Sequence, residues 1–167
     1  QIESNDVIAI GTNSSARGDG ATALAFEASA AGNGALAIGA DTDDSGVGAE
    51  ANGDRASAFG ADAQALGEDT TALGSNALAS GTSSIAVGLN AQGTEENAAA
   101  CGVNTNAAGR NSTAVGNNAQ TGDVAASAFG TQANASGSTS TAVGRLAASS
   151  GGGSTAIGNS ALASGNG

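Results

Sequence analysis

Apolar residues recur along this chain in a short alternation that ends at a glycine. In the stretch Ser-Ile-Ala-Val-Gly, Ile85 and Val87 lie on one face of an extended strand, and Ser84 and Ala86 lie on the other. The glycine that follows, Gly88, can turn the chain with a positive φ. The pattern therefore predicts a strand of four to five residues followed by a turn.

These glycines keep a period of seven residues from Gly11 to Gly165. Twenty of the 23 positions in this register are glycine, and the exceptions are Ala25, Glu95 and Asp123. Every second glycine follows alanine and an apolar residue, while the intervening glycines follow smaller and more polar residues, so two unequal halves make one 14-residue unit. The turn glycines of the first kind from residue 60 onward are Gly60, Gly74, Gly88, Gly102, Gly116, Gly130, Gly144 and Gly158.

A period of seven is also the period of a coiled coil, but the residues exclude one. Each glycine inside a helix costs about 1 kcal/mol, and the apolar pair that a heptad needs is missing. Two short strands and two turns in each unit instead predict an all-β fold, a parallel β-solenoid in which each coil pairs with the next.

The small and bulky residues of each unit are expected to face opposite ways. A coil this short leaves little room inside, so we expect the alanines to face inward and the bulky stripe to face outward, although the reverse assignment stays open at this stage. An exposed apolar stripe needs a cover, and the simplest cover is the same stripe on other copies of the chain, in a homotrimer. The stripe consists of Ile10, Leu24, Ile38, Phe59, Leu73, Val87, Cys101, Val115, Phe129, Val143 and Ile157.

The repeat is interrupted once, at about residues 40–53. Gly39 and Gly60 are separated by three periods of seven rather than by two, which we interpret as an additional half-repeat. The acidic stretch Asp41–Asp44 lies there, and its carboxylates could bind a cation through oxygen ligands. A solvated acidic turn is the favoured interpretation, because the spacing matches no known calcium loop, and no metal site is predicted.

Composition and charge argue against several classes of function. The chain of 167 residues has a net charge of −11 and contains no lysine or histidine, which argues against binding to nucleic acid or to an anionic membrane. The chain contains no run of 18 apolar residues, so no transmembrane helix is predicted. Without His, Lys or Tyr, and with no distinctive pair of carboxylates, the inventory does not favour an enzyme, and no cofactor is expected.

Three further features have simple structural interpretations. Cys101 occupies a stripe position and is interpreted as a small hydrophobic residue. Threonines recur at one repeat position, as in ice-binding arrays, but Ile85 and other apolar residues also occupy it, which favours a packed face. Glu95 and Asp123, which replace glycines, are expected either to mark bulged turns or to lie in ordinary solvated turns.

The repeated unit resembles the head repeat of YadA-like trimeric autotransporter adhesins, which has the form Asn-Ser-Val-Ala-Ile-Gly. The segment Asn111, Ser112, Thr113, Ala114, Val115 and Gly116 matches it best, and the resemblance extends from about Val7 to Gly165. It implies a left-handed parallel β-roll, three chains around one axis, and extracellular display on a bacterial outer membrane. Residues 1–167 would then be a head domain, with the stalk and membrane anchor outside it and no direct membrane contact.

The resemblance implies adhesion to host extracellular matrix, to host cells or to other bacteria. In some members of the family the Asn-Ser-Val-Ala-Ile-Gly segments are linked to collagen binding, which makes residues 111–116 the candidate ligand-contact segment. Threonine stands at position 113, where the family prefers valine. A structural spacer in a surface fibre and a segment of a phage tail fibre are the alternatives.

Overall fold

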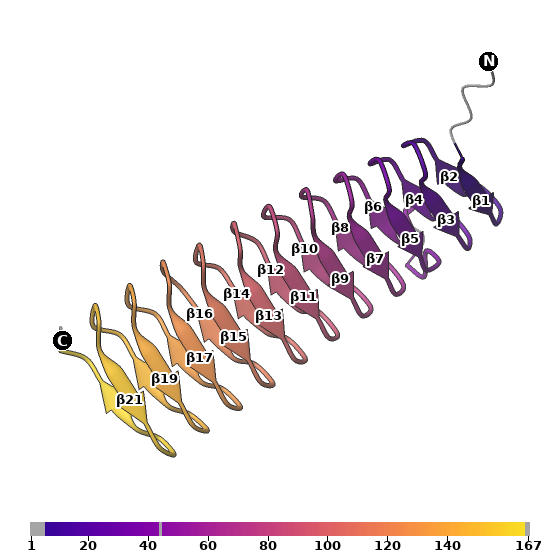
Figure 1. Cartoon of the computed structure of the whole chain (residues 1–167). Coiled ribbons are helices and arrows are strands. Elements are labelled where there is room, and N and C mark those ends of the chain that lie inside the picture. Colours follow the sequence, from indigo (N-terminus) through magenta and orange to yellow (C-terminus); the bar gives the residue numbers. More distant parts are fainter. Residues whose placement is uncertain (1–5, 44, 166–167) are drawn as a thin grey trace.

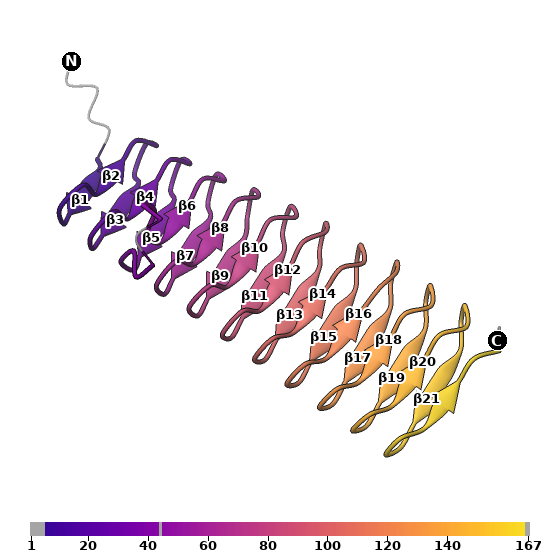
Figure 2. The ribbon, with the colours of Figure 1, turned by 180° about the vertical axis from the view of Figure 1, so that it is seen from behind.

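Two parallel sheets of 11 strands each run along the described chain, residues 6–43 and 45–165 of a computed structural model (Figures 1 and 2). Sheet A consists of three-residue strands: β1 Ile8–Ile10, β3 Thr22–Leu24, β5 Leu36–Ile38, β7 Ser57–Phe59, β9 Thr71–Leu73, β11 Ile85–Val87, β13 Ala99–Cys101, β15 Thr113–Val115, β17 Ser127–Phe129, β19 Thr141–Val143 and β21 Thr155–Ile157. Sheet B consists of two-residue strands: β2 Ser15–Ala16, β4 Ser29–Ala30, β6 Glu50–Ala51, β8 Gln64–Ala65, β10 Leu78–Ala79, β12 Gln92–Gly93, β14 Asn106–Ala107, β16 Gln120–Thr121, β18 Asn134–Ala135, β20 Ala148–Ser149 and β22 Leu162–Ala163.

Each coil of the chain adds one strand to each sheet. Ile85 pairs with Ala99 in sheet A, and Gln92 pairs with Asn106 in sheet B, which are offsets of one 14-residue unit. The predicted all-β parallel solenoid is therefore confirmed, whereas its left hand stays a prediction. No described residue lies in a helix with the length and hydropathy needed to cross a membrane.

The strands are shorter than the predicted four to five residues, because each turn takes up much of its half-unit. In a representative turn, Gly88 has φ +132° and Asn90 has φ +54°, and the amide of Ala91 donates to the carbonyl of Gly88 at 3.2 Å. Outside the long interval after Gly39, the residue two positions after the turn glycine is left-handed in the same way, a conformation that asparagine tolerates better than most residues. Asparagine side chains stack there, as in the 3.0 Å bond from Asn90 Nδ2 to Asn104 Oδ1.

The two kinds of glycine differ in their backbone conformation. Those that follow the bulky residue have positive φ, as predicted, but Gly109 and its equivalents after sheet B lie outside that region. A Cβ on Gly109 would lie 1.9 Å from the carbonyl oxygen of Asp123 in the next coil. A Cβ on Gly102, of the first kind, would likewise lie 2.7 Å from the carbonyl oxygen of Gly116. Both kinds of glycine therefore leave space for the next coil, and only the first kind also needs a positive φ.

Glu95 and Asp123 do not mark bulges. The amide of Ala98 donates to the carbonyl of Glu95 at 3.0 Å, and that of Ala126 donates to the carbonyl of Asp123 at 3.3 Å. These are the bonds of the ordinary turn, so the first alternative, bulged turns, is wrong.

The interior between the sheets is very thin. Among the described residues, every buried apolar side chain is an alanine, and the largest fully buried side chains are threonines such as Thr70 and Thr105. Their hydroxyls donate to the turn carbonyls of Gly67 and Gly102 at 2.7 and 2.6 Å. The expected inward direction of the alanines is confirmed, and serine and threonine share the interior with them.

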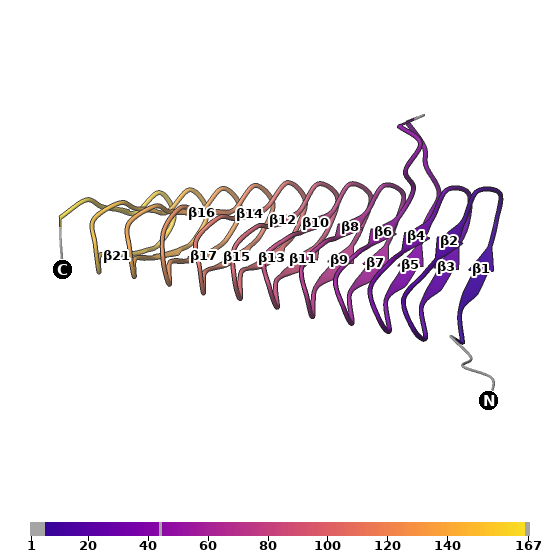
Figure 3. The same ribbon diagram turned by 90° about the horizontal axis from the view of Figure 1, so that it is seen from above.

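The long interval from Gly39 to Gly60 forms a loop rather than a half-coil. Ala30 pairs directly with Ala51, and Ala37 pairs directly with Ala58, so both sheets continue without an additional strand. The additional residues extend sideways from the rod between β5 and β6 (Figure 3). Seven residues can be accommodated there because a turn lies outside the ladder and its length does not alter the register.

Ala25 and Gly102 offer a reciprocal test of the turns. Ala25 has φ +113° where the other coils have glycine, and Gly102 has φ +136°. We expect Gly102→Ala to destabilise the fold by about 1–3 kcal/mol, because it adds backbone strain and places a Cβ 2.7 Å from the carbonyl oxygen of Gly116. Ala25→Gly should stabilise the fold by up to about 1 kcal/mol, because it relieves strain. Thermal unfolding followed by circular dichroism measures both changes.

The control for this pair is Gly122→Ala. Gly122 has no positive φ, and an added Cβ would have its nearest neighbour at 3.5 Å. The melting temperature of the Gly122→Ala variant should stay close to that of the unmodified chain. Equal effects of Gly102→Ala and Gly122→Ala would contradict the need for glycine at residue 102.

Candidate functional site

The bulky stripe lies on the outer face of sheet A, at the last residue of each strand. Leu73, Phe129 and Val115 expose 47%, 42% and 36% of their surface, and Cys101 is also exposed. The remaining members are Ile10 and Ile157 in the end coils, which are exposed, and Leu24, Ile38, Phe59, Val87 and Val143, which are half-buried. Because the strands pair in register, these side chains follow one another from coil to coil.

The first residue of each sheet A strand points outward beside the stripe. Ile85 is 44% exposed, and the threonines at this position, such as Thr71, Thr113 and Thr141, are half-buried. The turn glycines Gly60, Gly74, Gly88, Gly102, Gly116, Gly130, Gly144 and Gly158 end these strands with φ between +126° and +136°. Aliphatic, aromatic and hydroxyl groups therefore share this face, and no charged side chain occupies either strand position.

The candidate ligand-contact segment, residues 111–116, does not present one continuous surface. Ser112 and Ala114 are fully buried, and Ser112 Oγ accepts a 2.8 Å bond from Thr121, so neither can contact a ligand in the folded chain. Thr113 and Val115 lie on the outer face of sheet A. Asn111 is exposed in a turn, where it accepts a bond from Asn97 at 2.9 Å.

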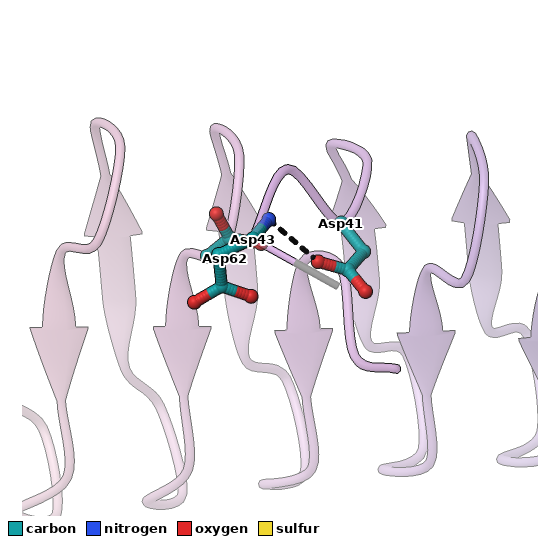
Figure 4. Close-up of side chains that lie close together, drawn as sticks. All are labelled: Asp41, Asp43 and Asp62. Carbon is teal, nitrogen blue, oxygen red and sulfur yellow. Dashed lines mark hydrogen bonds between the residues drawn. The ribbon is translucent and has the colours of Figure 1, made fainter. Parts of the chain in front are cut away.

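The acidic loop gathers three carboxylates. Asp41, Asp43 and Asp62 have carboxylate oxygens within 4.8 Å of one another, and such a set could hold a cation. Figure 4 shows the three side chains close together. Asp44, the last residue of the predicted acidic stretch, lies outside the described residues. The sequence did not indicate Asp62, because it joins the group from the next coil.

Hydrogen bonds within the loop already engage these carboxylates. Asp41 accepts from the amides of Asp43 at 3.0 Å and Gly46 at 2.7 Å. Asp62, which is 8% exposed, accepts from the amide of Thr42 at 3.2 Å and from its hydroxyl at 2.5 Å. The cluster therefore has a structural purpose, which is to fold the loop and fasten it to the following coil.

The electrostatics of the loop agree with that purpose. Desolvation by burial acts to raise the pKa of Asp41, but the amide donors of Gly46 and Asp43 stabilise its carboxylate, and the pKa lies below its ordinary value. In the next turn, the hydrogen bond from Arg55 lowers the pKa of Asp69, and the bonds to Asp69 and Glu68 raise the pKa of Arg55. These exposed pairs contribute little to stability.

Sequence reasoning also missed a polar surface on sheet B. A hollow of about 350 Å³ lies on its outer side, and Asn118, Gln120, Gln132, Ala133 and Asn134 line it. Amide side chains recur at this strand position, a signal that could have been read from the 14-residue period.

Comparison with known families supports the interpretation of the repeat. The model of the YadA head domain repeat matches more than half of the chain, over residues 8–24, 45–63, 65–91, 94–119, 124–147 and 149–167. No curated protein matches the chain with significance.

The hydrogen bonds of Asp41 make the loop sensitive to acid. Because its pKa lies below the ordinary value of 3.8, the stabilisation that its carboxylate provides is complete above that value and is lost as the pH falls through the lowered pKa. In a carboxyl carbon NMR titration we expect Asp41 to titrate below 3.8, with the Gly46 amide resonance following it. Asp41→Asn should remove the transition at Gly46, and an Asp41 that titrates above its ordinary value would refute this account.

Proposed function

Because this chain belongs to the YadA head domain repeat family, we propose that it is the head of a trimeric autotransporter adhesin whose three copies pack through the outer face of sheet A. The exposed stripe on that face is the observation that carries the proposal. Its members repeat at every coil, so a partner with the same repeat can match it along the whole rod.

The energetics of burial favour this assembly. Alanine removes little apolar area from water, and burial stabilises by about 25 cal/mol per Å², so the interior alone stabilises the coil weakly. The side chains with most to gain, such as Phe129, Leu73 and Ile157, are the ones that the single chain leaves exposed. Folding and trimerisation are therefore proposed to occur together, as in obligate oligomers that have no stable monomer.

Adhesion is assigned to the surfaces that a trimer leaves free, which are the turns and the outer face of sheet B. Extracellular matrix proteins such as collagen, host cells and other bacteria are the proposed partners, and three identical chains supply avidity. Within residues 111–116, Asn111 has an exposed side chain that lies in a turn and not on sheet A. Twelve of the 15 acidic residues lie at or before Asp69, so partners that are strongly anionic are disfavoured.

A passive spacer in a surface fibre is the second candidate. The ladder of sheet A continues through all 11 of its strands without a break, which is the property that a stiff spacer needs. Binding assays separate the two functions, because a spacer would trimerise without retaining any matrix protein or cell.

The trimer interface is tested by placing charge on the stripe. We expect the combined change Val87→Asp, Val115→Asp and Val143→Asp to abolish both the trimer and the β-structure, because each protomer would bring unpaired carboxylates into an apolar contact. Light scattering measures the mass of the assembly, and circular dichroism measures the fold.

The matched control places the same charges on the opposite face. Gln64, Gln92 and Gln120 begin strands of sheet B and point outward, so their combined change to Asp should leave both the mass and the spectrum intact. A trimer that survives the stripe variant, or is lost in the control, would be incompatible with packing through sheet A.

A further inference from the structure

A column of carboxamide side chains runs along the outer face of sheet B. Gln92, Asn106, Gln120 and Asn134 begin successive strands and pair in register, each with the next. One buried atom of the column, Asn106 Oδ1, has no hydrogen-bond partner. The column lies on the face turned away from sheet A, so it remains accessible if sheet A forms the trimer.

The hollow beside this column brings four carboxamides together from two neighbouring coils. Gln120 and Asn134 come from β16 and β18, and Asn118 and Gln132 come from left-handed turn positions with φ +55° and +58°. Asn118 Nδ2 donates to the neighbouring Asn117, whereas the side chains of Gln120, Gln132 and Asn134 make no hydrogen bond within the described residues. Each unpaired carboxamide offers two donors and one acceptor oxygen.

The charge of this region restricts what could bind there. No ionisable side chain lines the hollow, and the chain has no Asp or Glu after Asp123 and one Arg, Arg145. A phosphate, sulfate or carboxylate would find no cationic partner, and a metal ion would find no carboxylate. A ligand that matches this lining would therefore be uncharged and rich in groups that both donate and accept hydrogen bonds.

The backbone excludes one further class of ligand. Strand β16 pairs with β14 and β18, and β18 pairs with β16 and β20, so neither strand has a free edge to which an extended peptide could add. The apolar lining is confined to Ala133, which is fully buried and offers no anchor for a hydrophobic side chain.

We propose that this hollow binds a neutral saccharide, whose hydroxyl groups pair with the carboxamides of Gln120, Gln132 and Asn134. A volume of about 350 Å³ lies at the lower end of the usual range for small-molecule sites, which suits one or two sugar rings. No aromatic side chain lines the hollow for a sugar ring to stack on, so each site binds weakly. The inference rests on the proposed adhesin function for its biological meaning, since three copies on one head would raise the avidity.

Saturation-transfer NMR on the intact chain provides the test, with galactose, N-acetylgalactosamine and lactose as probes and N-acetylneuraminic acid as the charged comparison. We expect saturation transfer from the protein to the neutral sugars and little transfer to N-acetylneuraminic acid. The double variant Gln120→Ala and Asn134→Ala should bind the neutral sugars at least about fivefold more weakly, because it lacks hydrogen-bonding groups from both coils. Gln64→Ala, at the same strand position but outside the hollow, should leave binding unchanged.

Three results would overturn the proposal: no transfer to any neutral sugar at millimolar concentration, transfer undiminished in the double variant, or preferential binding of the acid. The proposal would also be overturned if the unmodified chain bound a collagen-like triple-helical peptide but no sugar, and the double variant did not bind that peptide. This result would assign the hollow to a protein ligand. Light scattering and circular dichroism on the same samples report the trimer and the fold, so failure of the saccharide site is distinguishable from failure of the proposed function.

Discussion

The space between the two sheets admits side chains no larger than threonine, and the rest of the structure depends on this limit. A coil made of two seven-residue halves brings its two strands so close that alanine, serine, threonine and glycine fill the interior, and every larger apolar group must point outward. Close spacing along the rod imposes a similar limit at the turns, where a Cβ on Gly109 would meet the backbone of the next coil. The unusual composition, rich in alanine and glycine, follows from these two distances.

The same limit separates the surfaces by function. Sheet A carries the bulky residues on its outer face and is proposed to be covered by other copies of the chain, whereas the outer face of sheet B carries the carboxamides from Gln92 to Asn134 and is proposed to stay accessible. The loop between β5 and β6 lies outside both ladders, so Asp41 and Asp62 could be added there without disturbing the register. A head built in this way can change its turns and its sheet B surface for a new ligand while its assembly face stays constant.

The sequence predicted the solenoid, its 14-residue unit and the inward alanines, because each depends on a local alternation repeated many times. It did not predict features that depend on contacts between coils. Asp62 joins the loop from the following coil, and Asn118, Gln120, Gln132 and Asn134 meet only when two coils stack. The alternation that places the equivalent Ser84 beside Ala86 also implies an inward Ser112, whereas the resemblance placed Ser112 in the ligand-contact segment; the structure buries it against Thr121. The need for glycine at Gly109 arises from the neighbouring coil and not from its own φ.

The central claim is that the thin interior cannot hold the fold without burial of the stripe between chains. Thermal unfolding at a series of protein concentrations, followed by circular dichroism, tests it most directly. For a trimer that folds as it assembles, the melting temperature rises with concentration, and the β-structure disappears at the dilution that releases single chains of 15.3 kDa. A melting temperature that does not change with concentration, together with a folded monomer at high dilution, would contradict the account.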